Sequence, residues 1–375
     1  MLKTPLHQFH IDHGAKMVEF AGWEMPLVYK PGITAEHHQV RSSGGIFDVS
    51  HMGRLYIKGR HARRWLERAC TRRIADMQAR QCRYSLMCNE RGGVRDDVLV
   101  YRMDDDEFMV VCNASNRDKI VAHLHEIQGD FKATLDDRTL KTAMIAVQGP
   151  KVMDVFAKFS KEIPTLKRYR FTEKNFLVMK VLVSRTGYTG EDGVEVILPA
   201  NMVGVAIKMV LKDIDMSADD AIIKPAGLGA RDTLRTEAGM PLYGHELGED
   251  INALSCGVDF AINLDKDQDE LGEKYIGCEA LQKTRDAGGP QRTLIGLDVE
   301  GKRTPRQGMT VVKGDKPVGV VTSGCTSPTS EKPIAMALVD REHAADGTDL
   351  RVDSGRDAFF ETRVRPLPFY KLAKK

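Results

Sequence analysis

The chain has 375 residues, of which 42% are hydrophobic and 29% charged, an ordinary composition for a globular protein with room for two or three domains. Its formal net charge of +2 gives no electrostatic reason to expect binding to nucleic acid or to a membrane surface. No apolar run approaches the roughly 18 residues of a membrane span, and none follows the first five residues as in a secretory signal. The seven scattered cysteines include no Cys-x-x-Cys pair, which favours reduced thiols in a cytoplasmic protein over disulfides or a zinc site.

Up to about residue 284 the chain mixes helical and strand patterns. Helices are expected where apolar side chains recur every three or four residues, and strands where β-prone side chains gather between turn-forming residues. The expected elements are, in chain order, a helix over 60–70, a hairpin of strands 98–102 and 107–112, a helix with Ile120, Val121, Leu124 and Ile127 on one face, strands over 142–148 and 176–184, and a helix over 201–211. The polar run 113–116 precedes the second helix and is expected to supply its N-cap.

A change in composition separates the end of the chain from the rest. The run Arg-Asp-Ala-Gly-Gly-Pro-Gln at 285–291 suits neither a helix nor a strand, so we place a linker there. Short β-rich runs, separated by Gly, Pro, Asp and Ser, follow at 293–299, 310–313, 317–322, 334–339 and 349–352. This pattern is typical of a small barrel or sandwich. The sequence therefore predicts an α+β fold, with a mixed region over 1–284 and an all-β domain over 285–375.

Several common motifs are absent or incomplete. The run 227–232 begins like a dinucleotide-binding loop, but Asp232 stands where the third glycine belongs and no βαβ pattern surrounds it. No Walker A loop and no G-x-S-x-G elbow occur. Glu36-His37-His38 lacks the spacing of a metal-binding helix, so its histidines are interpreted as surface residues.

Two early stretches place polar groups where a binding site is plausible. Residues 47–53 set Asp, Ser and His between apolar residues, and the alternative is a strand entry whose polar groups satisfy each other. In 89–97 two glycines allow a tight turn before the adjacent carboxylates of Asp96 and Asp97. Strand alternation sends these two to opposite faces, so at least one points inward, where a carboxylate needs a partner or a role. The alternative is an ordinary turn and hairpin.

Two later stretches are also candidates. Residues 184–195 carry three glycines at three-residue spacing with a tyrosine and acids between them, a loop that can approach a flat ligand closely or simply join two strands. Residues 230–239 read as a helix with Arg231 and Arg235 on one face. Ion pairs within that helix are the structural alternative.

Taken together, these stretches resemble the aminomethyltransferase family, the T-proteins of the glycine cleavage system. Matching segments run in family order over nearly the whole chain, and any one of them alone is a weak signal. They are 20–27, 47–53, 92–97, 146–150, 185–193, 227–239, 322–324 with 327–328, and 368–370.

The resemblance implies a multi-lobed α+β fold with folate in a central channel. Residues 1–284 would form the folate-binding region as two interleaved lobes, and 285–375 a C-terminal β-barrel. The implied reaction moves the carbon of an aminomethyl group from the lipoyl arm of H-protein to tetrahydrofolate, giving 5,10-methylenetetrahydrofolate, ammonia and the dihydrolipoyl arm. Tetrahydrofolate is then the acceptor substrate and lipoylated H-protein the partner, and no metal or redox cofactor is required.

The resemblance also implies site residues. Asp96 matches the catalytic aspartate, which would stabilise the iminium-like carbon during transfer, and substitution of Asp97 is expected to matter less because it points the other way. The folate contacts carried over are Met52, Tyr84, Asp96, Asn113, Tyr188, Glu195, Arg231 and Lys371. Among them Glu195 matches the pterin-binding acid and Arg231 the arginine on the ligand. Lys371 stands where the family sometimes has Arg, and a lysine cannot reproduce a bidentate contact.

Two other functions share the expected fold. A tetrahydrofolate-dependent demethylase would act on a small sulfonium or N-methyl compound, but the close match at 92–97 and 187–193 favours the T-protein. A non-enzymatic folate-binding factor for iron–sulfur assembly would carry a distinctive cysteine motif and lose part of the acidic site. Asp96 and Glu195 are both present, and Cys325 lacks such a setting.

Overall fold

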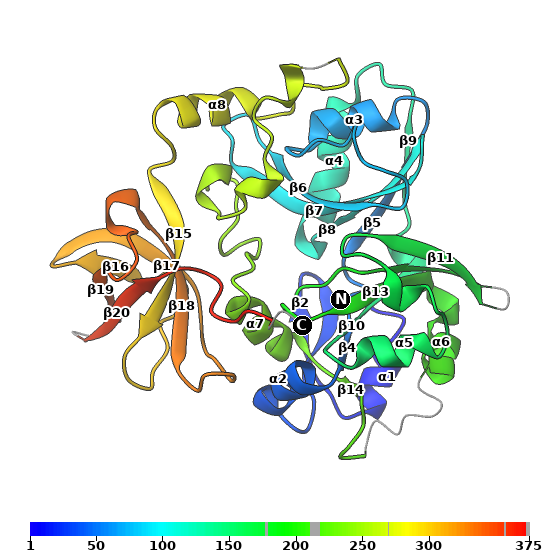
Figure 1. The fold of residues 1–375 in the computed structure, drawn as a ribbon, viewed down its shortest axis with the longest axis horizontal. Coiled ribbons are helices and arrows are strands. Elements are labelled where there is room, and N and C mark those ends of the chain that lie inside the picture. The colour runs from blue at the N-terminus through cyan, green and yellow to red at the C-terminus, as the bar shows by residue number, and fades with distance from the viewer. Residues whose placement is uncertain (177–178, 211–217, 269, 356–357, 373–375) are drawn as a thin grey trace.

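The computed structural model describes residues 1–176, 179–210, 218–268, 270–355 and 358–372. Two lobes, each built on a sheet, lie against one another, and a β-barrel formed by the end of the chain stands beside them (Figure 1). This arrangement confirms the predicted α+β fold with a C-terminal barrel. No helix in the described part of the chain is long and apolar enough to cross a membrane.

The first lobe contains a five-stranded antiparallel sheet in the order β6-β7-β8-β5-β9. Its strands are β5 (Gly53–Lys58), β6 (Cys82–Cys88), β7 (Val94–Asp104), β8 (Glu107–Cys112) and β9 (Thr134–Asp137). Helices α3 (Ala62–Ala69) and α4 (Arg117–Gln128) pack on one face of this sheet, where their apolar stripes join Val98 and Val100 of β7 in a buried core.

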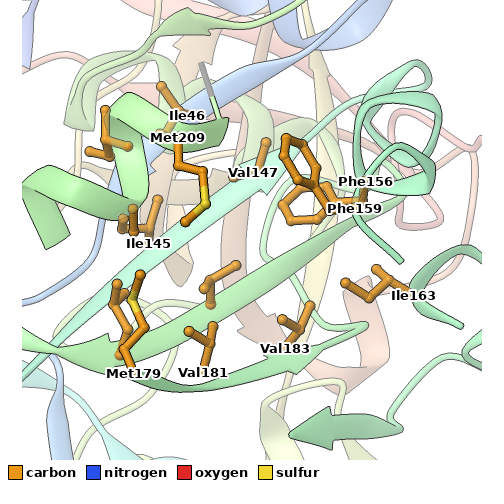
Figure 2. Close-up of a pocket in the computed structure, with 14 residues that line it drawn as sticks. Ile46, Ile145, Val147, Phe156, Phe159, Ile163, Met179, Val181, Val183 and Met209 are labelled. Carbon is orange, nitrogen blue, oxygen red and sulfur yellow. The ribbon is translucent and has the colours of Figure 1, made fainter. Parts of the chain in front are cut away.

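The second lobe contains a six-stranded sheet in the order β11-β12-β13-β10-β4-β14. Its strands are β4 (Gly45–Asp48), β10 (Thr142–Gln148), β11 (Phe171–Phe176), β12 (Met179–Ser184), β13 (Gly193–Pro199) and β14 (Lys224–Pro225). Helices α5 (Val152–Ala157) and α6 (Val203–Val210) cover its outer face. Between these helices and the sheet lies a cavity of about 80 Å³ that only apolar side chains line (Figure 2).

The inner faces of the two sheets share a central cluster that includes Phe47, Tyr101 and Ile197. The N-terminal elements are β1 (Leu2–Lys3), α1 (His7–Asp12), β2 (Lys16–Phe20), β3 (Trp23–Val28) and α2 (Ile33–Ser42), and Val40 of α2 belongs to this cluster. Helix α7 (Leu228–Glu237) packs against α2 and β3 and adds Ala230 and Leu234 to the cluster. The interface between the lobes is thus itself a core.

After α7 the chain returns to the first lobe and then forms the barrel. The returning segment contains the single turns η5 (Ala253–Ser255), η6 (Asp259–Ala261) and η7 (Lys266–Gln268) and helix α8 (Cys278–Asp286). The closed barrel has the order β15-β18-β17-β16-β19-β20. Its strands are β15 (Arg292–Val299), β16 (Thr310–Lys313), β17 (Lys316–Thr326), β18 (Pro333–Asp340), β19 (Asp349–Asp353) and β20 (Phe359–Arg365). Further single turns are η1 (Ala114–Asn116), η2 (Thr139–Lys141), η3 (Ile163–Thr165), η4 (Ala200–Met202) and η8 (Arg341–His343).

Most expected elements are present, with a few differences. The strand expected over 176–184 is the end of β11 and the whole of β12, and residues 177–178 lie outside the described residues. The helix expected over 201–211 starts as a 3-10 turn before α6, and residue 211 lies outside the described residues. The expected linker 285–291 is helical at its start, because α8 runs to Asp286. The barrel also has a sixth strand, β20, which was not among the expected β-rich runs.

Candidate active site between the two lobes

Asp96 and Asp97 lie on opposite faces of β7, as strand alternation requires. Asp96 is opposite Met87 and lies on the helix-covered face with Val98. Asp97 lies on the other face with Leu99, which packs into the central cluster between the sheets. Asp97 therefore points the other way from Asp96, as expected, but the face that it shares is the central one, where other candidate residues also lie.

Asp96 has an exposed fraction of 0%, and neighbouring donors occupy its carboxylate. The backbone N–H and the side-chain amide of Asn113 donate to it over 3.0 and 2.8 Å, and the Asn116 amide donates over 2.6 Å. Asn116 is the N-cap residue of α4, as expected for 113–116, but neither asparagine side chain accepts a hydrogen bond from the helix. These amides fasten the start of α4 to β7 instead.

Asp97 shares the Asn113 amide with Asp96 and has Tyr84 as a further partner. Its carboxylate accepts hydrogen bonds from the Asn113 amide over 2.7 Å and from the Tyr84 hydroxyl over 3.1 Å. Burial raises the pKa of both Asp96 and Asp97, and the charge of Asp97 raises that of Asp96 further. The pair therefore retains a proton more readily than exposed aspartates would.

Glu195 approaches the same space from β13 in the second lobe. It is 7% exposed, and alternation along β13 puts it on the face of Ile197, a member of the central cluster. The Thr186 hydroxyl donates to Glu195 over 2.5 Å. Burial raises the pKa of Glu195, although this hydrogen bond and the charge of Arg231 oppose the shift. The stretch 184–195 thus provides one carboxylate, from β13, together with its donor Thr186.

Arg231 and Tyr188 form a stacked pair beside Glu195. The Arg231 guanidinium carbon lies 5.0 Å from the centroid of the Tyr188 ring. Arg231 Nη1 is buried and has no hydrogen-bond partner among the described residues. The Tyr188 hydroxyl donates to the Pro241 carbonyl over 2.5 Å, which fixes the ring. A buried cationic donor without a partner is costly, so Nη1 is available for an acceptor on a ligand.

The second arginine of α7 has a structural role. Arg235 pairs with Asp232 at 2.8 Å and with Glu246 at 2.9 Å, so the ion-pair alternative holds for Arg235 and not for Arg231. The start of the helix is fixed separately, because the Gly227 N–H donates to Glu36 over 2.8 Å. Together these contacts set the direction in which α7 presents Arg231.

Met52 and Lys371 are less closely integrated. Met52 is half-buried and packs against the central cluster. Lys371 is exposed, but its neighbour Tyr370 is held in place because its N–H donates to the Glu237 carbonyl over 2.8 Å. The Arg41 guanidinium carbon lies 3.8 Å from the Tyr370 ring centroid. Lys371 therefore follows a fixed residue.

Within 47–53 the polar groups largely satisfy one another. Asp48 accepts from His10 over 2.9 Å and from the Ser50 N–H over 2.8 Å. His51 is buried with Nδ1 unpartnered among the described residues, and burial lowers its pKa to about 4. The structural alternative thus accounts for Asp48, and His51 is a neutral imidazole. His37, expected at the surface, is buried against Glu237 with Nε2 3.1 Å from the carboxylate.

Sequence reasoning missed one aromatic side chain near the site. Phe260, in η6, is 60% exposed, and its ring centroid lies 5.8 Å from that of Tyr84. The guanidinium carbon of Arg72, in the loop after α3, lies 5.8 Å from the Phe260 centroid. No motif marks Phe260, because it comes from a non-repetitive segment far along the chain from Tyr84. Within the described residues, no cluster of His, Cys, Asp and Glu is arranged to hold a metal ion.

The whole fold has a close counterpart among solved structures. It superposes on the crystal structure of the glycine cleavage system aminomethyltransferase T from Bartonella henselae with a TM-score of 0.89 and 30% sequence identity, covering 99% of this chain and 98% of that one. The two sheet lobes and the barrel are thus the architecture of that class of enzyme.

Sequence comparisons agree over both parts of the chain. Residues 6–266 match the GCVT N-terminal domain, and residues 292–371 match the glycine cleavage T-protein C-terminal barrel domain. The aminomethyltransferase of Saccharopolyspora erythraea is 41% identical over 372 residues, covering 98% of each chain. That of Alkaliphilus oremlandii is 40% identical over 380 residues, covering 100% of this chain and 98% of the relative. The chain belongs to the aminomethyltransferase family of glycine cleavage T-proteins, which are folate-dependent transferases.

Proposed function

We propose that this aminomethyltransferase transfers the methylene carbon from the aminomethyl-lipoyl arm of H-protein to tetrahydrofolate. The products are 5,10-methylenetetrahydrofolate, ammonia and dihydrolipoyl H-protein. The observation that supports this most directly is the Asp97 carboxylate, fixed by Tyr84 and Asn113 on the central face that Glu195 also occupies. A site for this reaction needs anionic groups that meet both a developing positive charge and the N–H donors of a pterin.

The other side chains suit the parts of folate. The Glu195 carboxylate can accept from a pair of pterin N–H groups through charge-assisted hydrogen bonds. The unpartnered Nη1 of Arg231 suits an oxygen acceptor on the ligand or its anionic tail. Tyr188 and Met52 offer flat and soft apolar walls. Lys371 supplies a point charge rather than a bidentate contact for the tail.

The two aspartates have distinct roles in this proposal. During transfer the carbon–sulfur bond breaks with its electron pair staying on sulfur, and the carbon is iminium-like until a folate nitrogen bonds to it. Ammonia then leaves, and a second folate nitrogen closes the ring. The family resemblance implies that Asp96 lies at this carbon, but its carboxylate already accepts hydrogen bonds from the Asn113 and Asn116 amides. Asp97 is better placed to stabilise the charge, with Asp96 positioning it through Asn113.

The test is turnover with aminomethylated H-protein and tetrahydrofolate, with free sulfonium and N-methyl compounds offered separately. Methylene transfer from H-protein alone is the expected result, and demethylation of a small compound would favour the demethylase alternative. We also expect a cytoplasmic enzyme, since the cysteines of the described residues are all unpaired.

A further inference from the structure

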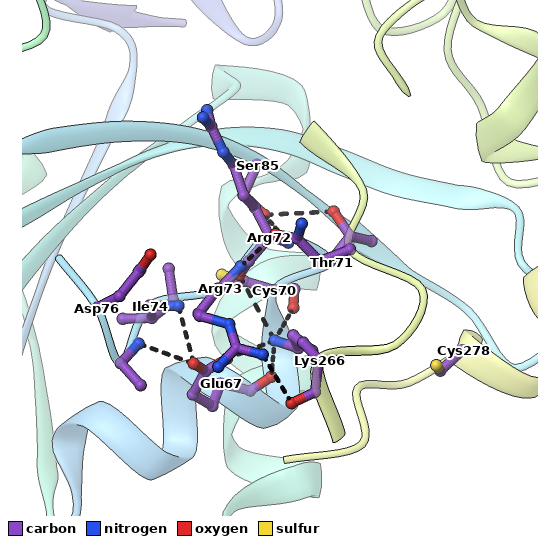
Figure 3. A network of polar contacts seen from close by, with 12 residues as sticks. Glu67, Cys70, Thr71, Arg72, Arg73, Ile74, Asp76, Ser85, Lys266 and Cys278 are labelled. Atoms are coloured by element: carbon purple, nitrogen blue, oxygen red, sulfur yellow. Dashed lines mark hydrogen bonds and ion pairs between the residues drawn. The ribbon is translucent and has the colours of Figure 1, made fainter. Parts of the chain in front are cut away.

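A lysine is buried in the first lobe, outside the proposed site. Lys266 of η7 is 1% exposed, and its Nζ lies 2.6 Å from the Glu67 carboxylate of α3 (Figure 3). Nζ also donates to the backbone carbonyls of Glu67 and Cys70, over 2.6 Å each. All three ammonium protons therefore have acceptors, and Lys266 caps the C-terminal end of α3.

The other carboxylate oxygen of Glu67 organises the loop that follows α3. It accepts the backbone N–H groups of Ile74 and Ala75 over 2.9 and 2.7 Å. The ion pair is thus the point at which the end of α3, the loop 70–75 and η7 are joined. A buried ion pair often adds little net stability over an apolar pair, whereas it does specify one arrangement of the groups around it.

The loop 70–75 in turn holds the segment 259–263. The Thr71 hydroxyl donates to the Ala261 carbonyl over 2.7 Å, and the Asn263 N–H donates to the Thr71 carbonyl over 3.0 Å. The Arg73 N–H donates to the Asn263 side chain over 2.9 Å. These three hydrogen bonds hold the backbone just after Phe260, at Ala261 and Asn263.

Phe260 depends on this backbone support for its position. Because its ring is 60% exposed, packing contributes little to fixing it. The ring is nevertheless inclined at only 31° to that of Tyr84, whose hydroxyl binds Asp97. Two aromatic side chains held in this way offer a planar ring of a ligand a wall next to the carboxylate.

We infer that Lys266 and Glu67 are positioning residues for folate binding, which hold Phe260 beside Tyr84 through the loop 70–75 and the segment 259–263. The inference rests on the proposed function, in which Tyr84 lies against tetrahydrofolate. Because the pair acts through the loop 70–75 and the segment 259–263, its loss is expected to affect binding more than the chemical step.

The experiment compares Lys266→Met with Phe260→Ala and with both together. The matched control is Lys274→Met, which removes an exposed lysine that pairs with Glu279. We expect Lys266→Met and Phe260→Ala each to raise the KM for tetrahydrofolate about fivefold, the effect of an aromatic contact, while kcat stays within about twofold. The combined variant should show no further rise, since both changes remove the same contact. The inference is overturned if the rise in KM of the combined variant equals the product of the two single rises, or if Lys266→Met leaves the KM unchanged.

A second measurement keeps the test valid if Lys266→Met does not fold. Replacing both partners, Glu67→Met with Lys266→Met, removes the charges without leaving one of them unpaired. Amide hydrogen exchange over 259–263 should quicken at least tenfold in the folded variant, and exchange at the wild-type rate overturns the inference. This readout does not need folate. Wild-type protein that fails to bind tetrahydrofolate would contradict the proposed function, and the exchange rates would still decide whether the pair holds the segment.

Discussion

The carboxylates of Asp96 and Asp97 are linked through one side-chain amide, although they lie on opposite faces of β7. Asn113 Nδ2 is 2.8 Å from an Asp96 oxygen and 2.7 Å from an Asp97 oxygen. The amide has two N–H groups, so each carboxylate can take one. A change at either aspartate therefore alters the environment of the other, and their effects on turnover should be coupled but unequal.

We predict that Asp97→Asn lowers kcat by about 100-fold or more, the loss typical of removing one group that stabilises transition-state charge. Tetrahydrofolate affinity should stay within roughly tenfold, because this carboxylate acts on charge that develops during transfer. Asp96→Asn should lower kcat less, by about tenfold, because it acts through Asn113. Single-turnover rates and calorimetric affinities measure both quantities. A larger kcat loss in Asp96→Asn would return the catalytic role to Asp96, as the family resemblance implied.

We predict that Glu195→Gln weakens tetrahydrofolate binding by at least about 1.5 kcal/mol, the lower end for a hydrogen bond to a charged group. The fold should persist, because the Thr186 hydroxyl can still donate to the amide oxygen of glutamine. Calorimetry measures the affinity, and the melting temperature checks the fold. Unchanged affinity in a folded variant would remove Glu195 from the folate site.

The sequence was sufficient for the elements whose pattern is local. The helix with Ile120 and Leu124 on one face and the strands 107–112 and 310–313 are visible in side-chain spacing, because each buries one face against a neighbour. The sixth barrel strand, Phe359–Arg365, was not among the expected runs, although its charged residues alternate with buried ones as in a half-buried strand. These local patterns were enough to predict an α+β region followed by an all-β domain.

The site was predictable only in part. Adjacent carboxylates after two glycines indicated a functional strand, but alternation alone could not say which face was central. That depends on the packing of Leu99 against residues from the other lobe. Asn116 lies in a run that was interpreted only as a helix cap, and Phe260 reaches the site through a contact with Tyr84, which is distant in the sequence.

The junction between barrel and body predicts a dependence of stability on pH. Glu237 accepts from the Ser327 hydroxyl over 2.5 Å, from the Thr329 hydroxyl over 2.7 Å and from Arg41 over 3.0 Å. Burial alone would raise the pKa of Glu237, but hydrogen bonds from His37 and Ser327 outweigh it and lower the pKa to about 2. The charged carboxylate therefore stabilises the folded state above the unfolded pKa of about 4.5, and this contribution is lost as the pH falls toward 2.

We predict that Glu237→Gln lowers the free energy of unfolding at pH 7 by on the order of 3 kcal/mol, and that the difference from wild type narrows as the pH falls below about 4.5. Denaturant unfolding between pH 3 and 7 measures it. Glu331→Gln is the control, because Glu331 is exposed on the same loop as Thr329. A difference that does not change with pH would mean that the Glu237 charge is not the stabilising feature.

The last prediction concerns docking of H-protein, whose lipoyl arm has to enter from the surface. H-proteins are expected to be acidic, and basic residues gather on the first lobe at 60–73. There Arg64 and Arg68 both pair with Glu273, with Arg64 Nη2 2.5 Å and Arg68 Nη2 3.6 Å from its carboxylate. Opposite charges on two proteins raise the rate of encounter more than the final affinity.

We therefore expect kcat/KM with H-protein to fall as salt rises from about 20 to 200 mM, where the Debye length shrinks from roughly 20 to 7 Å. A free aminomethylated lipoyl donor should be far less sensitive, because it uses the site without the surrounding surface. Parallel salt series with the two donors separate these effects, and equal slopes would mean that no electrostatic docking surface contributes.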